Sequence, residues 1–78
     1  FRSLSLFRIR VSKPSDSMDI NNIANSFGAK VHDARRDSIM VELTATPEQI
    51  NNLQELLLPY GILDVARTGV AALQRGGD

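Results

Sequence analysis

Residues 38–50, SIMVELTATPEQI, contain a strand that passes directly into the start of a helix. Ile39, Val41 and Leu43 alternate with the residues between them, and a period of two is typical of a strand with one buried face. The polar TATPEQ that follows carries the signals of a helix start. This strand and this helix have the clearest signals in the chain. The other elements are assigned by their position before or after these two.

The helix begins with a capping box. Thr46 is the predicted N-cap, Pro47 suits the first helical position, and Gln49 reaches back to the cap. Pro59 and Gly61 end the helix. Apolar residues at helical spacing form its buried face, which consists of Ile50, Leu53, Leu56 and Leu57.

Toward the N-terminus, residues 4–12 alternate as a strand. Phe7, Ile9 and Val11 lie on one face. The opposite face carries Leu4, Leu6, Arg8 and Arg10.

A break rich in capping residues follows this strand, and Ser15, Asp16 or Ser17 is expected to start a helix there. Gly28 ends that helix. Its apolar stripe consists of Ile20, Ile23, Ala24 and Phe27.

The remaining elements complete a recognisable order. Residues 30–35 predict a short polar strand, Arg36 and Asp37 form a hairpin turn, and residues 62–68 form the last strand. The order strand–helix–strand–strand–helix–strand predicts an α+β fold. It is a ferredoxin-like two-layer sandwich with an antiparallel sheet of spatial order 4-1-3-2 and both helices on one face.

The predicted core combines the helix-facing residues of all six elements. It consists of Phe7, Ile9, Val11, Ile20, Ile23, Phe27, Val31, Ile39, Val41, Leu43, Ile50, Leu53, Leu57, Leu63 and Val65. The first and third strands are central in this topology, and both carry apolar residues on the far face: Leu4, Leu6 and Met40. We predict that these three form an oligomer face, since an uncovered sheet face is ordinarily polar. The alternative is that they are scattered surface residues.

Composition excludes several classes of function. Nine basic and nine acidic residues cancel, which disfavours nucleic acid and anionic membranes as partners. RNA-binding domains of this topology stack bases on aromatic residues of the central strands, but Phe7 is assigned to the core and the third strand has no aromatic residue.

The apolar runs are too short to span a membrane. With no cysteine and no start methionine, we expect a fragment of a cytosolic protein.

No catalytic or metal-binding constellation is predicted. His32 is the only histidine, so a metal site or a catalytic triad has too few ligands or bases. The carboxylates near the helix start and the hairpin are read as local solvation. Arg67 has two open interpretations: an ion pair at the end of a strand, with Gly69 permitting a bend, or an anchor that positions the tail against a partner. Spacing alone favours the first.

The second half of the chain resembles a known family. Phe27, Ala29, Val31 and Asp33 fit a segment that closes the first helix and opens the second strand. The ending DVARTG, residues 64–69, is more specific, and Leu73, Arg75 and Gly76 continue the pattern. From about residue 6 to residue 76 the chain resembles the C-terminal domain of the small, regulatory subunit of acetolactate synthase. The loop at residues 12–17 and the hairpin at 35–37 do not match family motifs.

The resemblance implies a non-catalytic role. The catalytic subunit of such an enzyme holds thiamine diphosphate, magnesium and FAD, and this domain is expected to hold no cofactor. The small subunit is implied to activate that subunit and to confer valine-type feedback control in branched-chain amino-acid synthesis. The alternative is a free-standing, ACT-like amino-acid sensor that binds its ligand at a dimer interface.

The resemblance also implies partners and boundaries. Residues 1–76 would be one C-terminal domain and residues 77–78 a flexible tail, in the cytoplasm of a bacterium or in a plastid. The expected partners are the catalytic subunit and further copies of the chain. Five residues are the candidate subunit contact, because an apolar run follows a glycine in a chain whose core is already complete: Arg67, Thr68, Gly69, Val70 and Leu73.

Overall fold

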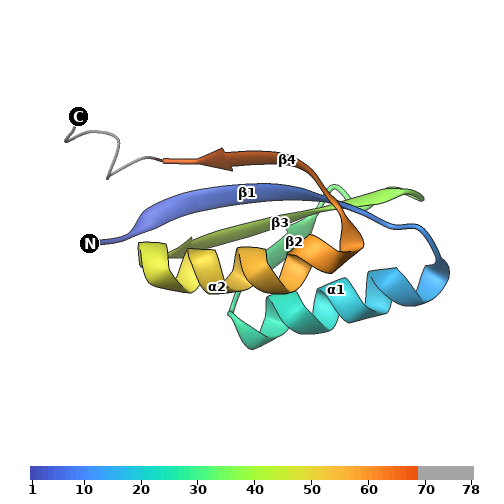
Figure 1. Ribbon diagram of the computed structural model, residues 1–78, viewed down its shortest axis with the longest axis horizontal. Coiled ribbons are helices and arrows are strands. Elements are labelled where there is room, and N and C mark those ends of the chain that lie inside the picture. The colour runs from blue at the N-terminus through green and yellow to red at the C-terminus, as the bar shows by residue number, and fades with distance from the viewer. Residues whose placement is uncertain (69–78) are drawn as a thin grey trace.

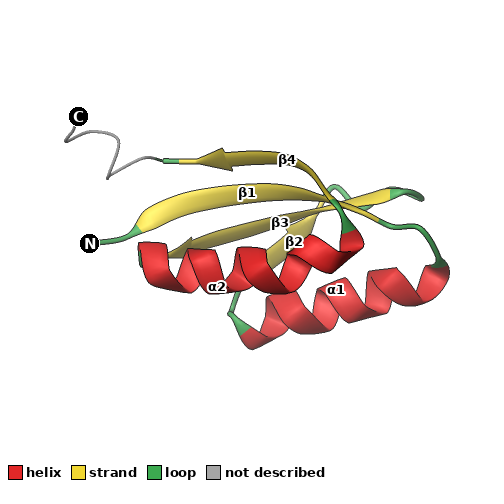
Figure 2. Cartoon of the chain, in the orientation of Figure 1, coloured by secondary structure: helices red, strands yellow, loops and turns green. Residues whose placement is uncertain are grey.

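A computed structural model describes residues 1–68 of the chain as a four-stranded sheet with two helices on one of its faces (Figure 1). Figure 2 shows the helices in one layer and the strands in the other. The elements in chain order are β1 (Ser3–Arg10), α1 (Pro14–Ser26), β2 (Lys30–His32), β3 (Ser38–Ala45), α2 (Pro47–Leu57), a short 3₁₀ turn (Leu58–Tyr60) and β4 (Ile62–Arg67).

The strand order is β2-β3-β1-β4, and every neighbouring pair is antiparallel. This confirms the predicted order 4-1-3-2 and the ferredoxin-like architecture. The two inner strands, β1 and β3, pair over their whole length, from Ser3 opposite Ala45 to Arg10 opposite Ser38. Phe7 therefore lies between Val41 and Val65, on the face that the helices cover.

Both helices begin at identifiable caps. Thr46 Oγ1 accepts a hydrogen bond from the Gln49 amide at 3.2 Å, and Gln49 Oε1 accepts one from the Thr46 amide at 3.1 Å, as predicted. The prediction for α1 was wrong by several residues. The cap position is Lys13, because Pro14 supplies the first helical residue and Asp16 Oδ2 accepts from the amides of Ser12 and Lys13.

Most of the predicted core is buried, and four residues are partly buried beside it: Val11, Ile23, Phe27 and Val31. The fully or almost fully buried residues are Phe7, Ile9, Ile20, Ile39, Val41, Leu43, Ile50, Leu53 and Leu57, joined by Ala24 and Ala45.

Three predictions of burial were wrong. Leu63 and Val65 are 48% and 40% exposed because β4 is an edge strand of the sheet. The register of β4 also shifts beside Arg8 and Ile9, so that Ile62 rather than Leu63 packs against the core. Leu56, which was assigned to the buried face of α2, is 50% exposed.

Strand β2 is shorter than predicted. It ends at His32 because Asp33 has a positive φ of 49°, which breaks the extended backbone. The loop that follows returns to the sheet through a hydrogen bond of 2.8 Å from the Arg35 amide to the Ser38 carbonyl. Strand β1 ends at Arg10, and the amide of Val11 instead donates to the Asp37 carbonyl at 2.8 Å.

Candidate functional site: the open face of the sheet

The face of the sheet opposite the helices is called the open face below (Figure 1). Cross-strand partners share a face, so the register identifies its side chains. Leu6 lies between Glu42 of β3 and Ala66 of β4, and the next row along β1 places Arg8 between Met40 and Asp64. Leu4 pairs with Thr44 and is 37% exposed, whereas Leu6 and Met40 are half-buried.

A small apolar hollow occupies one end of the open face. It has a volume of about 170 Å³ and is lined by Leu4, Leu6, Ala66, Arg67 and Thr68. The first two residues belong to the predicted oligomer face, and the last two belong to the predicted subunit contact. The structure therefore brings parts of two separate predictions into one surface. Met40 lies one row away, opposite Arg8, and does not line the hollow.

Thr68 ties the end of β4 to the start of β1. Its amide donates to the Leu4 carbonyl at 2.8 Å, and its Oγ1 accepts from the Leu4 amide at 2.8 Å. These two bonds extend the ladder beyond Arg67, the last residue of β4. The residues that follow in the chain, including Gly69, Val70 and Leu73 of the predicted contact, lie outside the described residues.

Arg67 attaches the same strand end to the helical layer. Its Nη1 donates to Asn51 Oδ1 at 2.8 Å and to Gln54 Oε1 at 3.2 Å, both on α2. Within the described residues, the partners of this guanidinium are neutral amides rather than a carboxylate. Together, the contacts of Arg67 and Thr68 hold the end of β4 from both sides.

Charged side chains border the apolar part of the open face. Arg8 pairs with Asp33, which also accepts a hydrogen bond from Arg35 Nη2 at 3.1 Å. Hydrogen bonds from Arg8, and then from Arg35, hold the pKa of the Asp33 carboxyl below its ordinary value of 3.8. His32 Nε2 lies 3.1 Å from Glu42 Oε1 on the same border.

Sequence reasoning missed the ion pair between Arg8 and Asp33. It treated Asp33 as solvation beside the hairpin turn, although Asp tolerates the left-handed backbone conformation that carries it back toward the sheet. The pairing of adjacent strands β1 and β3 places Arg8 close to the turn, with Arg8 Nη1 donating to Ser38 Oγ at 3.2 Å.

The described residues hold no group of three or more His, Asp or Glu side chains that could bind a metal ion. No helix in the described part of the chain is long and apolar enough to cross a membrane. What residues 1–68 do present is an apolar surface with a charged border on a small domain, which suits contact with another protein.

The fold is that of a ferredoxin-like α+β domain. Residues 2–76 match the family described as the small subunit of acetolactate synthase. The chain belongs to this family, and corresponds to the C-terminal part of its members.

Individual relatives agree with the family match. The acetolactate synthase small subunit of Bacillus subtilis is 48% identical over 75 residues, which cover 96% of this chain and 43% of the relative. The small subunit of Mycolicibacterium smegmatis is 37% identical, with 96% and 44% covered. The crystal structure of the small subunit from Thermotoga maritima superimposes with a TM-score of 0.79 at 25% identity, covering 87% of this chain and 41% of that one. The chain thus spans less than half the length of these relatives.

Proposed function

We propose that this chain is a non-catalytic regulatory and assembly domain of acetolactate synthase. In this role it helps the small subunit to activate the catalytic subunit and to confer valine-type feedback control on branched-chain amino-acid synthesis. One observation carries the proposal most directly. The open face presents Leu4 and Leu6 around an apolar hollow, at the point where Arg67 and Thr68 hold the end of β4.

The open face supports contact with a second protein surface for an energetic reason. When a partner covers apolar surface that was exposed to water, the complex is stabilised by about 25 cal/mol for each Å² of apolar surface buried. Leu4 is 37% exposed although β1 is one of the two inner strands of the sheet. The charged border formed by Arg8, Asp33 and Glu42 resembles the polar rim of protein interfaces.

Two partners follow from this proposal. A further copy of the chain covers Leu4, Leu6 and Met40 on the open face, and the catalytic subunit contacts the end of β4 together with the residues after it. Thiamine diphosphate, magnesium and FAD belong to the catalytic subunit in this scheme, and the domain acts in the cytoplasm, or in a plastid in a plant.

The test is a titration of the chain into a purified acetolactate synthase catalytic subunit from the same source. Acetolactate formation and co-elution are both followed. The proposal expects activity to rise and the two proteins to co-elute. Leu6→Ser changes the apolar hollow that Leu6 lines together with Arg67 and Thr68 of the subunit contact, and it should weaken the effect by about tenfold, which corresponds to the loss of one interface anchor. Leu56→Ser is the matched control, since Leu56 is an exposed leucine of α2 on the opposite layer.

Two outcomes contradict the proposal. An equal loss in both variants would show that the open face has no special role. If valine alone raised the Tm of the chain while the catalytic subunit had no effect, the chain would instead be an amino-acid sensor, because a ligand stabilises the folded state that binds it.

A further inference from the structure

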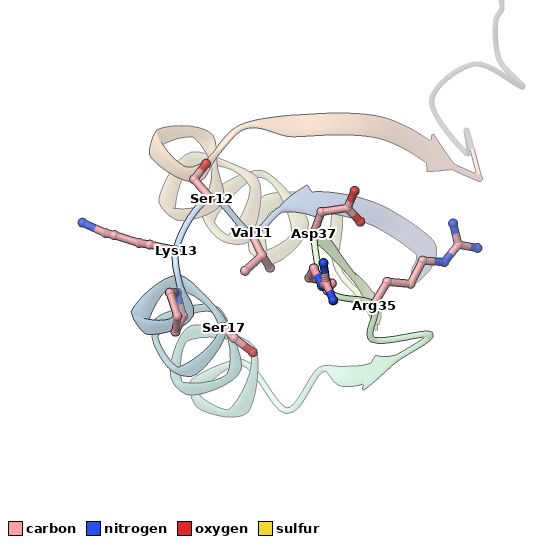
Figure 3. Close-up of a pocket in the computed structure, with 8 residues that line it drawn as sticks. Val11, Ser12, Lys13, Ser17, Arg35 and Asp37 are labelled. Carbon is pink, nitrogen blue, oxygen red and sulfur yellow. The ribbon is translucent and has the colours of Figure 1, made fainter.

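A second concave surface lies at the other end of β1, away from the apolar hollow (Figure 3). This cleft has a volume of about 550 Å³, which is in the range of small-molecule sites. One wall is the segment from Val11 to Pro14 together with Ser17, at the start of α1. The opposite wall is the turn before β3, residues 35–37. The cleft therefore shares no lining residue with the apolar hollow at the end of β4.

Positive charge is concentrated at this cleft. Lys13, Arg35 and Arg36 line it with a single carboxylate, Asp37, although the chain as a whole has nine basic and nine acidic residues. Arg35 shares Asp33 with Arg8. Lys13 and Arg36 form no ion pair with any residue in the described part of the chain, so their charges are not neutralised there.

The cleft also has an apolar wall. Val11 packs partly buried against the core, and Pro14 follows it along the same wall. In Figure 3, Lys13 and Arg35 lie at opposite edges with Val11 and Ser17 between them, and their charged ends are directed outward. Long, flexible cationic side chains on both edges of an apolar wall can turn toward a ligand that lies between them.

Charge for a ligand has to come from these side chains rather than from the backbone of α1. Asp16 Oδ2 already accepts from the amides of Ser12 and Lys13 at 3.0 and 3.2 Å. The start of the helix thus has its own carboxylate. A ligand held by two or three exposed cations is recognised by its charge, and it needs more than one negative charge to bind measurably.

We propose that this cleft binds a small organic anion with at least two negative charges, as in a phosphate ester or a dicarboxylate. Lys13 and Arg36 supply the charge, and the carbon skeleton of the ligand lies on Val11 and Pro14. Binding is weak, with a dissociation constant of about 1 mM, because the cations are exposed. This inference is independent of the assembly role, since the cleft shares no lining residue with the apolar hollow.

The test is an NMR titration of the ¹⁵N-labelled chain with malonate and, separately, with glycerol phosphate, while sodium chloride holds the ionic strength constant. The proposal expects saturable shifts of the amides of residues 11–13, 15–17 and 35–37, and none at the apolar hollow. Titration with both probes separates the two ligand sources: stronger binding of one identifies carboxylate or phosphate as the preferred group.

Matched variants complete the test. The double variant Lys13→Gln and Arg36→Gln should weaken binding by at least about tenfold while Tm stays unchanged. Lys30→Gln removes an exposed cation on β2, outside the cleft, and should leave binding intact. Amide shifts that rise linearly with ligand concentration without saturating would overturn the proposal. An equal loss of binding in Lys30→Gln would also overturn it, because the anion would then be responding to exposed surface charges in general.

Discussion

The two faces of the sheet use the same strands in different ways. On the face toward the helices, Phe7 and Ile9 of β1 are fully buried. On the open face, Leu4 of the same strand is 37% exposed, and Arg8 forms an ion pair with Asp33. An apolar side chain on the covered face packs in the core between sheet and helices. An apolar side chain on the open face has no helix of the described residues packed over it. The same residue type therefore contributes to stability on one face, and on the other it forms the surface that we propose as an interface.

The largest effect is expected from a cavity on the covered face. Leu53 of α2 is fully buried, and Leu53→Ala should lower the free energy of unfolding by about 2–5 kcal/mol. In so small a domain this loss approaches the whole stability. Leu56→Ala on the same helix is the matched control, because Leu56 is 50% exposed and should cost less than about 1 kcal/mol. Urea denaturation measures both, and equal costs would mean that the face of α2 is assigned wrongly.

The next largest effect concerns the turn into β4. Gly61 has a φ of 103°, and a Cβ there would lie 3.3 Å from Arg10 Nη1 and 3.4 Å from Arg10 Cβ. Gly61→Ala should therefore cost about 1–3 kcal/mol from backbone strain and crowding. Gly28→Ala should cost less, because its φ of 71° is close to the left-handed helical region and its Cβ would meet nothing within 4 Å. Thermal unfolding compares the two, and the reverse ranking would contradict the geometry.

A smaller effect on stability, with a larger effect on association, is expected on the open face. Leu4→Ser combined with Leu6→Ser should cost only about 1–2 kcal/mol, because no helix covers either residue. It should nevertheless shift any self-association of the chain toward the monomer, and sedimentation velocity at several concentrations measures this. If the double variant associates as the unchanged chain does, Leu4 and Leu6 are ordinary surface residues.

The smallest effect is expected from the ion pair at the border of the open face. Hydrogen bonds from Arg8, the larger cause, and from Arg35 lower the pKa of the Asp33 carboxyl in the folded state. Folding therefore favours the ionised form of this carboxyl. Its contribution is present above the ordinary pKa of 3.8 and is lost as the pH falls through the lower folded value. Asp33→Asn keeps a residue that tolerates a positive φ and should remove this part of the pH dependence. An unchanged slope of Tm against pH below 5 would show that the pair contributes nothing, as many exposed pairs do.

Local signals in the sequence were enough to predict the element order and most of the core. The alternation from Ile39 to Leu43 and the capping box at Thr46 depend on neighbouring residues only, and both are present in the structure. The sheet order followed from the helix–strand sequence and the handedness of crossovers.

Features that depend on distant residues were missed. The exposure of Leu63 arises from a register shift against β1, which no pattern within β4 reveals. The apolar hollow joins Leu4 to Thr68, and the basic cleft joins Lys13 to Arg36, so each required the pairing of segments far apart in the chain. The positive φ of Asp33 and the cap position of α1 at Lys13 are local choices among several that the sequence permits equally well.

The central claim, that the open face meets a partner, is tested most directly by site-specific photo-crosslinking. The chain has no cysteine, so Leu4→Cys and Leu56→Cys each provide a single attachment point for a photo-crosslinker, at positions that are 37% and 50% exposed. Each labelled chain is irradiated with the acetolactate synthase catalytic subunit present. The account predicts that position 4 crosslinks to the catalytic subunit or to a second copy of the chain, and that position 56 does not. Efficient crosslinking from position 56 with none from position 4 would contradict it.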